Sequence, residues 1–303
     1  MRAPWIDVIV PTFNNSGELM ACLEALRRQS GIAPRVLVCV DGSIDDTRDM
    51  VVNLSPQIAM AVLEHGDRQN HGRSSARNLA LSAVRANFVA LVDSDMRLDP
   101  EALGHHLRVV EANDVVSIGA VVYETGGSSL WARYQATRGR AKRRDGAAVR
   151  PLDFTSANAV MRAEHFLAVG GFDEHLDGYG GEDTELGLRL AEERHLTFVY
   201  NEQAVARTIE TKSVAEGLSQ LDRYARTNLR AIRRRHPNGP APFWIDRATS
   251  RRIRDRILRL ALNRVGEATA RTLLPRMPFQ VQRRLLDYLV IRTVFNGYLD
   301  GPR

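Results

Sequence analysis

The sequence contains few cysteines and no long apolar segment. Cys22 and Cys39, the two cysteines among its 303 residues, both stand in apolar stretches. They are typical of small core residues in a reducing compartment, not of a disulfide framework. No run of eighteen apolar residues occurs, which argues against a membrane-spanning helix. The opening MRAPWIDVIVPTF resembles a strand and lacks the apolar core of a signal peptide. We therefore expect a cytoplasmic protein, either free or at the inner face of the membrane.

Two common phosphate-binding motifs are also missing. The loops between the first apolar runs contain neither G-x-G-x-x-G nor G-x-x-x-x-G-K-[ST], which argues against a dinucleotide-dependent dehydrogenase and a P-loop nucleotidase. Aromatic residues make up 6% of the chain, and no aromatic platform or recognition helix accompanies its arginines. We therefore expect no nucleic acid partner.

Lysine is absent from the last part of the chain. Residues 214–303 hold 19 arginines against 7 acidic residues, a balance of +12, whereas residues 1–213 have a balance of −6. Apolar stripes set among these arginines predict a basic helical region. Three interpretations stay open: peripheral contact with anionic membrane, a homodimer or acceptor-domain interface, or a solvated helix face.

Apolar runs alternate with helical patterns over the first part of the chain. Apolar runs at 6–10, 36–40, 58–63 and 88–92 predict buried strands, and residues 72–86 predict a helix. A last strand is expected near 196–200. Strands of this kind, separated by helices, favour a Rossmann-like α/β fold. We expect a mostly parallel central sheet with helices on both faces.

Residues 124–153 break this alternation. They are rich in glycine, then basic in the run RGRAKRR, and they include Trp131. This composition predicts a mobile segment over a site.

Three polar loops follow three of the predicted strands directly. They are Pro11–Asn14, Asp41–Ser43 and Asp93–Asp95. The carboxyl ends of parallel strands lie along one edge of a sheet, where ligands bind. Three aspartates there would repel one another unless a cation or hydrogen-bond donors compensate. Each loop taken alone is also compatible with an ordinary strand-to-helix turn.

Six segments, in order, resemble those of family 2 glycosyltransferases with the GT-A fold. They are VIVPTFN, VDGSIDDT, NHGRSSARN, VDSD, GGFDE and GGEDTELGLRL, spread over roughly residues 5–210. The resemblance implies a GT-A catalytic domain over 1–213, with a nucleotide-binding half (1–100) and an acceptor half (101–213), followed by the basic helical region 214–303. It also implies a nucleotide-sugar donor, with uridine as the expected base. The acceptor would be a sugar, a lipid-linked compound or a small molecule.

The resemblance implies roles for the donor-side residues. Pro11, Thr12 and Asn14 would border the nucleoside, and Asp41 would accept a hydrogen bond from the base edge. Val40 stands where relatives often have a first acid. Arg77 would pair with the base edge or the diphosphate, although a surface helix arginine is the alternative.

The triplet Asp93–Ser94–Asp95 matches the metal motif of the family. Asp95 would bind Mn²⁺ or Mg²⁺ directly, and Asp93 would contact the ribose or a metal-bound water. An extended segment would point both side chains the same way. Arg207 occupies the place where many relatives have a histidine ligand, and it would neutralise the diphosphate instead.

The acidic segment after GYGG matches the catalytic motif. Asp183 would act as general base, and Glu182 would bind acceptor hydroxyls. Tyr179, Gly181 and Trp131 would line the acceptor site. Both acids also suit a helix N-terminus, whose dipole would lower their pKa. The resemblance implies hexosyl transfer by a single inverting displacement, although retaining transferases carry a similar motif. The rival interpretations are a sugar nucleotidyltransferase and a non-catalytic carbohydrate or nucleotide-sugar binding protein.

Overall fold

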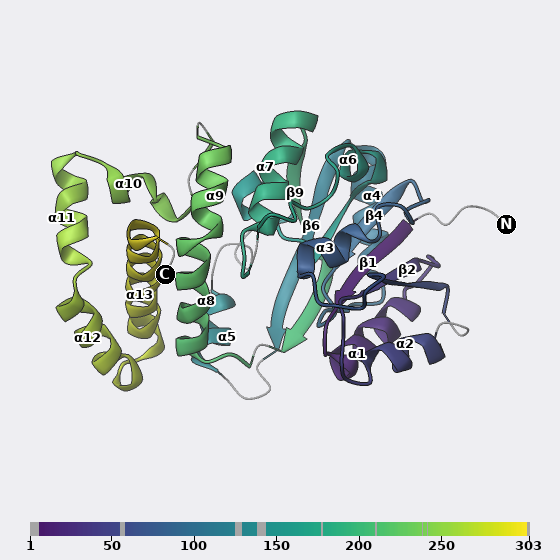
Figure 1. Ribbon diagram of the computed structural model, residues 1–303, viewed down its shortest axis with the longest axis horizontal. Helices are drawn as coiled ribbons and strands as arrows, with labels where there is room; N and C mark the ends of the chain where they lie inside the picture. The colour runs from purple at the N-terminus through teal and green to yellow at the C-terminus, as the bar shows by residue number, and fades with distance from the viewer. Residues whose placement is uncertain are drawn as a thin grey trace. The chain divides into compact units, whose positions relative to one another are not determined.

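The computed structural model divides into two compact units (Figure 1). The structure describes residues 6–54, 58–124, 129–137, 144–176, 178–209, 211–237, 239–240 and 242–301. The first unit comprises 1–126, 136–175 and 182–210, and the second comprises 127–135, 176–181 and 211–303. Residues 125–128 and 138–143, one third of the segment 124–153 predicted to be mobile, lie outside the described residues.

A single mixed sheet forms the centre of the first unit. Its spatial order is β3-β2-β1-β4-β8-β6-β9-β5, with β7 paired to β9. The strands that the structure describes are β1 (Ile6–Thr12), β2 (Arg35–Val40), β3 (Met60–Glu64), β4 (Phe88–Val92), β5 (Arg97–Leu98), β6 (Val115–Glu124), β7 (Ala148–Val149), β8 (Asn158–Arg162) and β9 (Thr197–Ile209). The half from β3 to β4 is parallel, as the apolar runs predict. The strand β8 then pairs antiparallel with both β4 and β6.

Helices cover both faces of this sheet (Figure 1). The helices of this unit are α1 (Ser16–Arg27), α2 (Thr47–Leu54), α3 (Arg73–Asn78), α4 (Ala102–Ala112), the 3-10 turn η2 (Pro151–Asp153), α6 (Ala163–Ala168) and α7 (Glu182–Arg194). Alternate side chains of a strand point to opposite faces. Thus Val8 packs in the core beneath α1, α2 and α4, and Ile9 packs in the core beneath α3, α6 and α7. The α/β fold and the helices on both faces are confirmed.

The helix predicted over 72–86 is shorter than expected. Helix α3 ends at Asn78, and the chain continues through turns whose N–H groups bond three residues back, such as Leu81 to Asn78 (3.0 Å). The prediction was wrong because the Asn78 side chain is held by a distant segment. Its amide nitrogen donates to the Phe172 carbonyl, and its oxygen accepts from the Phe172 N–H. The shortened helix leaves Arg77 in its last turn.

The second unit is helical, and its helix α8 starts at Val214, where the sequence predicts the helical region to begin. The helices described are α5 (Leu130–Gln135), α8 (Val214–Arg226), α9 (Asn228–Arg235), η3 (Pro242–Trp244), α10 (Asp246–Thr249), α11 (Ile253–Ala261), α12 (Arg264–Leu273), η4 (Leu274–Arg276) and α13 (Phe279–Asp300). Ser213 and Glu216 form a capping box at the start of α8. Within the described ranges, no helix has the length and apolarity that a membrane crossing requires.

Candidate active site

Hydrogen bonds join the loops that follow β1 and β2. The Asp41 N–H donates to the Thr12 carbonyl (2.9 Å), and the Asn14 N–H donates to Ser43 Oγ (3.0 Å). Asn14 has a positive φ of 47° and accepts from the Ile44 N–H through its side chain (2.8 Å). Two of the three polar strand ends therefore form one connected rim, as predicted.

Asn15 connects the third polar loop to this rim. Its backbone N–H donates to Thr47 Oγ1 (3.0 Å), and its side-chain amide donates to Ser94 Oγ (3.1 Å). The sequence prediction missed this residue, although it directly follows the predicted Asn14 and is the N-cap residue of α1. Asn15 holds the loop after β4 against the loop after β1.

The carboxylate of Asp41 binds the protein's own next loop. One oxygen accepts from the His71 N–H (2.8 Å), and the other accepts from the Gly72 N–H (3.0 Å) and the Asn70 amide (2.9 Å). The side chain is buried. Asp41 thus fixes the start of α3, and its predicted contact with a base edge stays a prediction.

Pro11 and Thr12 lie at the end of β1, in register with Cys39 and Val40 of β2. The Thr12 hydroxyl is buried and has no hydrogen-bond partner among the described residues. An unpaired buried hydroxyl is costly, which is expected at a site that a ligand completes. Contact of Pro11 and Thr12 with a nucleoside stays a prediction.

The Asp93–Ser94–Asp95 triplet forms a turn and not an extended segment. The Met96 N–H donates to the Asp93 carbonyl (3.0 Å), which closes the turn right after β4. The prediction of an extended triplet was therefore wrong, because the chain reverses between β4 and the short strand β5. Asp93 and Asp95 consequently have different partners.

Arg77 is a buried cation and not a surface helix arginine. Its side chain is 4% exposed, and its Nη2 donates to Asp93 Oδ1 (2.6 Å). Its Nη1 lies 3.9 Å from Glu182 Oε1 and has no hydrogen-bond partner among the described residues. The guanidinium also lies 5.0 Å from the centre of the Phe172 ring. Arg77 therefore links the loop after β4 to the start of α7.

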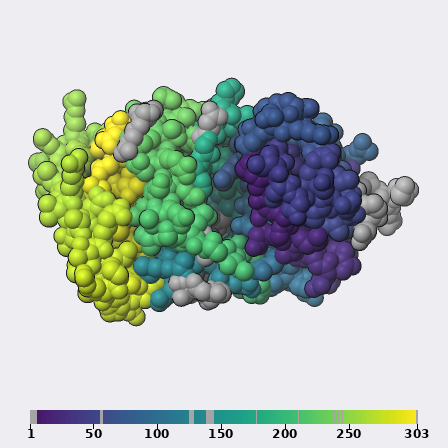
Figure 2. Space-filling view, turned by 60° about the horizontal axis from the view of Figure 1, so that its bottom comes forward, coloured from purple at the N-terminus to yellow at the C-terminus, as the bar shows by residue number. Residues whose placement is uncertain are grey.

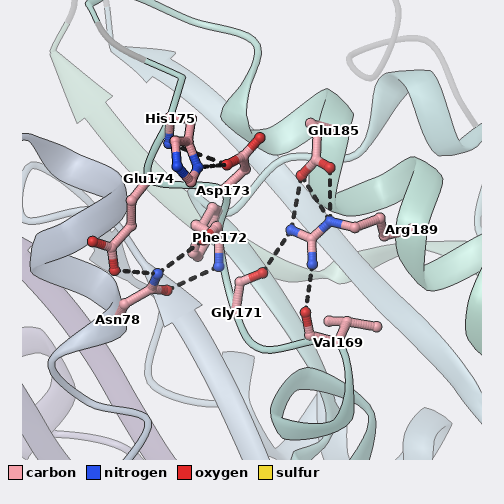
Figure 3. A network of polar contacts seen from close by, with 9 residues as sticks. All are labelled: Asn78, Val169, Gly171, Phe172, Asp173, Glu174, His175, Glu185 and Arg189. Carbon is pink, nitrogen blue, oxygen red and sulfur yellow. Dashed lines mark hydrogen bonds and ion pairs between the residues drawn. The ribbon is translucent and has the colours of Figure 1, made fainter. Parts of the chain in front are cut away.

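Figure 3 shows how the GGFDE segment is held around Phe172. The Asn78 amide donates to the Phe172 carbonyl and its oxygen accepts from the Phe172 N–H, both at 2.8 Å. Arg189 of α7 donates to the carbonyls of Val169 (2.6 Å) and Gly171 (2.7 Å), and its guanidinium is held by the buried Glu185. The segment beneath Arg77 is therefore fixed from α3 and from α7.

Asp95 accepts a hydrogen bond from Thr208 Oγ1 (3.3 Å) near the end of β9. The preceding Arg207 instead makes a bidentate pair with Asp99, at 2.8 and 2.9 Å. Arg207, at the position where many relatives have a histidine ligand, is thus ion-paired with Asp99. This pairing disfavours the direct contact of Arg207 with a diphosphate that the sequence suggested, and it leaves Thr208 as the neighbour of Asp95.

Glu182 and Asp183 begin α7. Glu182 is buried and faces Arg73 (3.3 Å). Asp183 accepts from Ser156 Oγ at 2.6 Å. Burial and then the neighbouring Glu182 raise the pKa of Asp183 to about 6, against the opposing charge of Arg77. The helix dipole does not lower the pKa of Asp183 below its usual range, contrary to the prediction, because burial dominates. A carboxyl of this pKa is still mostly ionised at neutral pH.

The three predicted acceptor residues belong to the second unit. Trp131 is 4% exposed and packs on Tyr134 and on Gly217, where a side chain would overlap its ring. Gly181 has a positive φ of 97° and leaves room for the Tyr224 ring. Tyr179 is half-buried. The structure thus gives Trp131 and Gly181 packing roles, and an acceptor contact stays a prediction for all three.

The Asp93 and Asp95 carboxylates fit a divalent cation of the Mg²⁺ or Mn²⁺ type. Among the described residues, no group of three or more His, Cys, Asp or Glu side chains is arranged to hold a metal ion. Such ions keep several waters and take further oxygens from substrate phosphates, so one or two carboxylates suffice. Both aspartates supply hard oxygen ligands.

The sheet, the rim of loops and the acid pair define a GT-A type α/β protein. The family model described as "Glycosyl transferase family 2" matches residues 7–170, and a second model, "N-terminal domain of galactosyltransferase", matches residues 152–212. The chain belongs to glycosyl transferase family 2. The resemblance seen in the six sequence segments is thereby confirmed.

Curated relatives share moderate identity with the chain. It is 29% identical over 223 residues to validoxylamine A glucosyltransferase of Streptomyces hygroscopicus subsp. limoneus, covering 62% of this chain and 48% of that protein. It is 24% identical over 222 residues to chondroitin synthase of Escherichia coli, covering 62% of this chain and 32% of that protein. The matches therefore span about half or less of these relatives' own length.

Solved structures share the fold at low identity. A mannosyltransferase from Pyrobaculum calidifontis in complex with GDP-Man and Mn²⁺ superposes with a TM-score of 0.65 and 18% identity, over 98% of this chain and 88% of that one. TarS of S. aureus, residues 1–349, in complex with UDP-GlcNAc has a TM-score of 0.57 and 16% identity, over 97% and 91%. Both confirm the GT-A fold.

Proposed function

We propose that the chain transfers a sugar from a nucleoside-diphosphate donor to an acceptor hydroxyl, with Asp183 as general base. The observation that carries this proposal is the buried guanidinium of Arg77. It bonds Asp93 at 2.6 Å and lies 3.9 Å from Glu182. One cation thus connects the predicted donor rim with the acid pair. A plain strand-to-helix turn would have no need of a buried arginine in this position.

The donor would lie along the rim formed by the loops after β1, β2 and β4. A bound Mn²⁺ or Mg²⁺ would be held by Asp95 and Asp93 and would supply charge neutralisation for the diphosphate. Arg77 Nη1, which has no hydrogen-bond partner among the described residues, offers a further donor for a phosphate oxygen, in a site where burial strengthens the interaction. Uridine as the base rests on the family resemblance alone.

Asp183 would take the proton of the acceptor hydroxyl. The acceptor oxygen forms a bond to the anomeric carbon while the bond from that carbon to the diphosphate oxygen breaks. The bonding electron pair leaves with the nucleoside diphosphate, and the proton stays on the Asp183 carboxylate. Ser156 holds this carboxylate by its 2.6 Å hydrogen bond. A single displacement of this kind inverts the anomeric centre.

Glu182 would orient the acceptor beside the base. It directly precedes Asp183 and is held by Arg73 at 3.3 Å. Its charge also keeps the Asp183 proton affinity high, which suits a group that must accept a proton near neutral pH.

Donor binding tests the first half of the proposal. UDP-, GDP- and dTDP-sugars are titrated calorimetrically with and without Mn²⁺. We expect one donor class to bind more tightly with Mn²⁺, and Asp95→Ala to lose most of that gain. Asp49→Ala, an exposed acid on α2, serves as the matched control and should bind as the wild type does. If Asp95→Ala bound the donor as tightly as the wild type does in the presence of Mn²⁺, the role of Asp95 as a metal ligand would be contradicted.

A further inference from the structure

Helix α11 presents an apolar stripe outward from its unit. Ile253, Ile257 and Leu260 are 76%, 61% and 74% exposed. Their spacing of four and three residues places them on one face of the helix. The yellow-green segment containing α11 and α12 lies at the surface of the second unit in Figure 2. Surface helices of globular proteins normally turn such a stripe to the core.

The polar side of α11 is fastened inward instead. Asp255 is buried and its carboxylate lies 3.8 Å from the guanidinium of Arg247 in α10. Arg259 donates to the carbonyls of Arg247 and Ser250, both at 2.8 Å. The outward direction of the isoleucines is therefore fixed by specific contacts on the opposite side of the helix.

Exposed arginines flank the apolar stripe. At 3.6 residues per turn, Arg254 and Arg256 fall on its two sides, and both are exposed. Asp255 is the single acidic residue between positions 251 and 266, and it is buried on the other face. Arg254 Nε lies 3.8 Å from the Asp255 carboxylate, which also faces Arg247. The exposed face of α11 thus combines apolar side chains with an excess of positive charge.

We propose that this face of α11 lies on an anionic phospholipid surface. The isoleucines and Leu260 would enter the boundary between headgroups and acyl chains, and the long arginine side chains would reach the phosphates. A second copy of the same face is a poor occupant, because a two-fold contact would bring Arg254 and Arg256 against the same arginines. This inference does not depend on the proposed sugar transfer.

Vesicle flotation tests the proposal with the full chain. Vesicles of phosphatidylcholine alone are compared with vesicles that also contain about one third phosphatidylglycerol. We expect the chain to float with the anionic vesicles only. Ile257→Asn with Leu260→Asn should lower the bound fraction roughly tenfold. The control Leu299→Asn changes another exposed leucine of the same unit, on α13, and should bind as the wild type does.

Charge is tested separately from apolar contact. Arg254→Gln with Arg256→Gln should weaken binding to the anionic vesicles by roughly tenfold or more at low salt. Arg234→Gln with Arg284→Gln removes the same charge from exposed positions on α9 and α13 and should have a much smaller effect. An equal loss of vesicle binding by the two double variants would overturn the role of this face, because the total charge of the chain alone would then explain the binding.

A third measurement reports directly on the surroundings of the apolar stripe. Ile257→Cys, labelled with an environment-sensitive fluorophore, should shift to shorter wavelength when anionic vesicles are added. Leu299→Cys, labelled in the same way, should not shift. Absence of flotation by the wild type, an unchanged spectrum at position 257, or concentration-dependent self-association that Ile257→Asn abolishes would overturn the proposal.

Discussion

Replacing Ser156 with alanine should move the acid limb of the pH–rate profile to higher pH. The Ser156 hydroxyl donates to the Asp183 carboxylate at 2.6 Å and so favours its ionised form. Without this hydrogen bond the carboxyl holds its proton more tightly. Because the proposed base must be ionised to accept a proton, activity should disappear at a higher pH than in the wild type.

The size of the shift follows from the hydrogen bond. A hydrogen bond to a charged group contributes about 1.5–3 kcal/mol, and one pKa unit corresponds to about 1.4 kcal/mol. The pKa of Asp183, which burial raises to about 6, should therefore rise by about one to two units. At pH 6 a rise of one unit lowers the ionised fraction from about one half to about one tenth. At pH 9 the variant should approach wild-type activity.

The assay is kcat/KM for sugar transfer measured across the pH range, since this parameter reports the free enzyme. Ser82→Ala, at an exposed serine in the same unit, should keep the wild-type profile. A lower rate for Ser156→Ala at every pH with an unmoved acid limb would refute the reasoning. Such a result would show that Ser156 shapes the site without acting on the protonation of Asp183.

Three further predictions follow from other contacts. Glu182→Gln removes a charge that raises the pKa of Asp183, so the acid limb should move to lower pH in the same assay. Burial lowers the pKa of His106 to about 4, so the unfolded chain binds more protons between pH 6.5 and 4. The free energy of unfolding should therefore fall by about 3 kcal/mol as the pH falls from 7 to 4. In urea titrations, the free energy of unfolding of His106→Asn should fall by less over the same pH range. Gly181→Ala would place a side-chain carbon 2.7 Å from the Tyr224 ring at a positive φ, and urea titration should show a destabilisation of about 1–3 kcal/mol.

The strands β1, β2 and β4 of the parallel half could be predicted because both of their faces are buried. Residues 36–40 of β2 and all of β4 are consecutive apolar residues, a pattern that can be recognised without knowing which strands pair with them. The strand β9 was expected only near 196–200 but extends to Ile209. From Ala204 to Thr208 its residues alternate between buried and half-buried, and two of them are polar. The helix over 72–86 was overestimated because the tertiary contacts of Asn78 are not encoded in helical spacing.

The candidate site was predictable where a residue type itself suggests chemistry. Aspartates after strands and acids at a helix start drew attention to Asp93, Asp95 and Asp183. Their partners Ser156 and Thr208 were missed because a single serine or threonine carries little signal. These contacts also join residues 27 and 113 positions apart in the chain. Only the folded chain brings such pairs together.

Product formation by wild type and Asp183→Asn tests the central claim most directly. Nucleoside-diphosphate sugars are incubated with Mn²⁺ and a mixture of sugar, small-molecule and lipid-linked acceptors, and glycosylated products are detected by mass spectrometry. The account predicts transfer by the wild type from one donor class. It predicts a loss of about 10²–10⁴ in rate for Asp183→Asn, with donor affinity unchanged by calorimetry. Full transfer by Asp183→Asn, or no transfer by the wild type from any donor that binds, would contradict it.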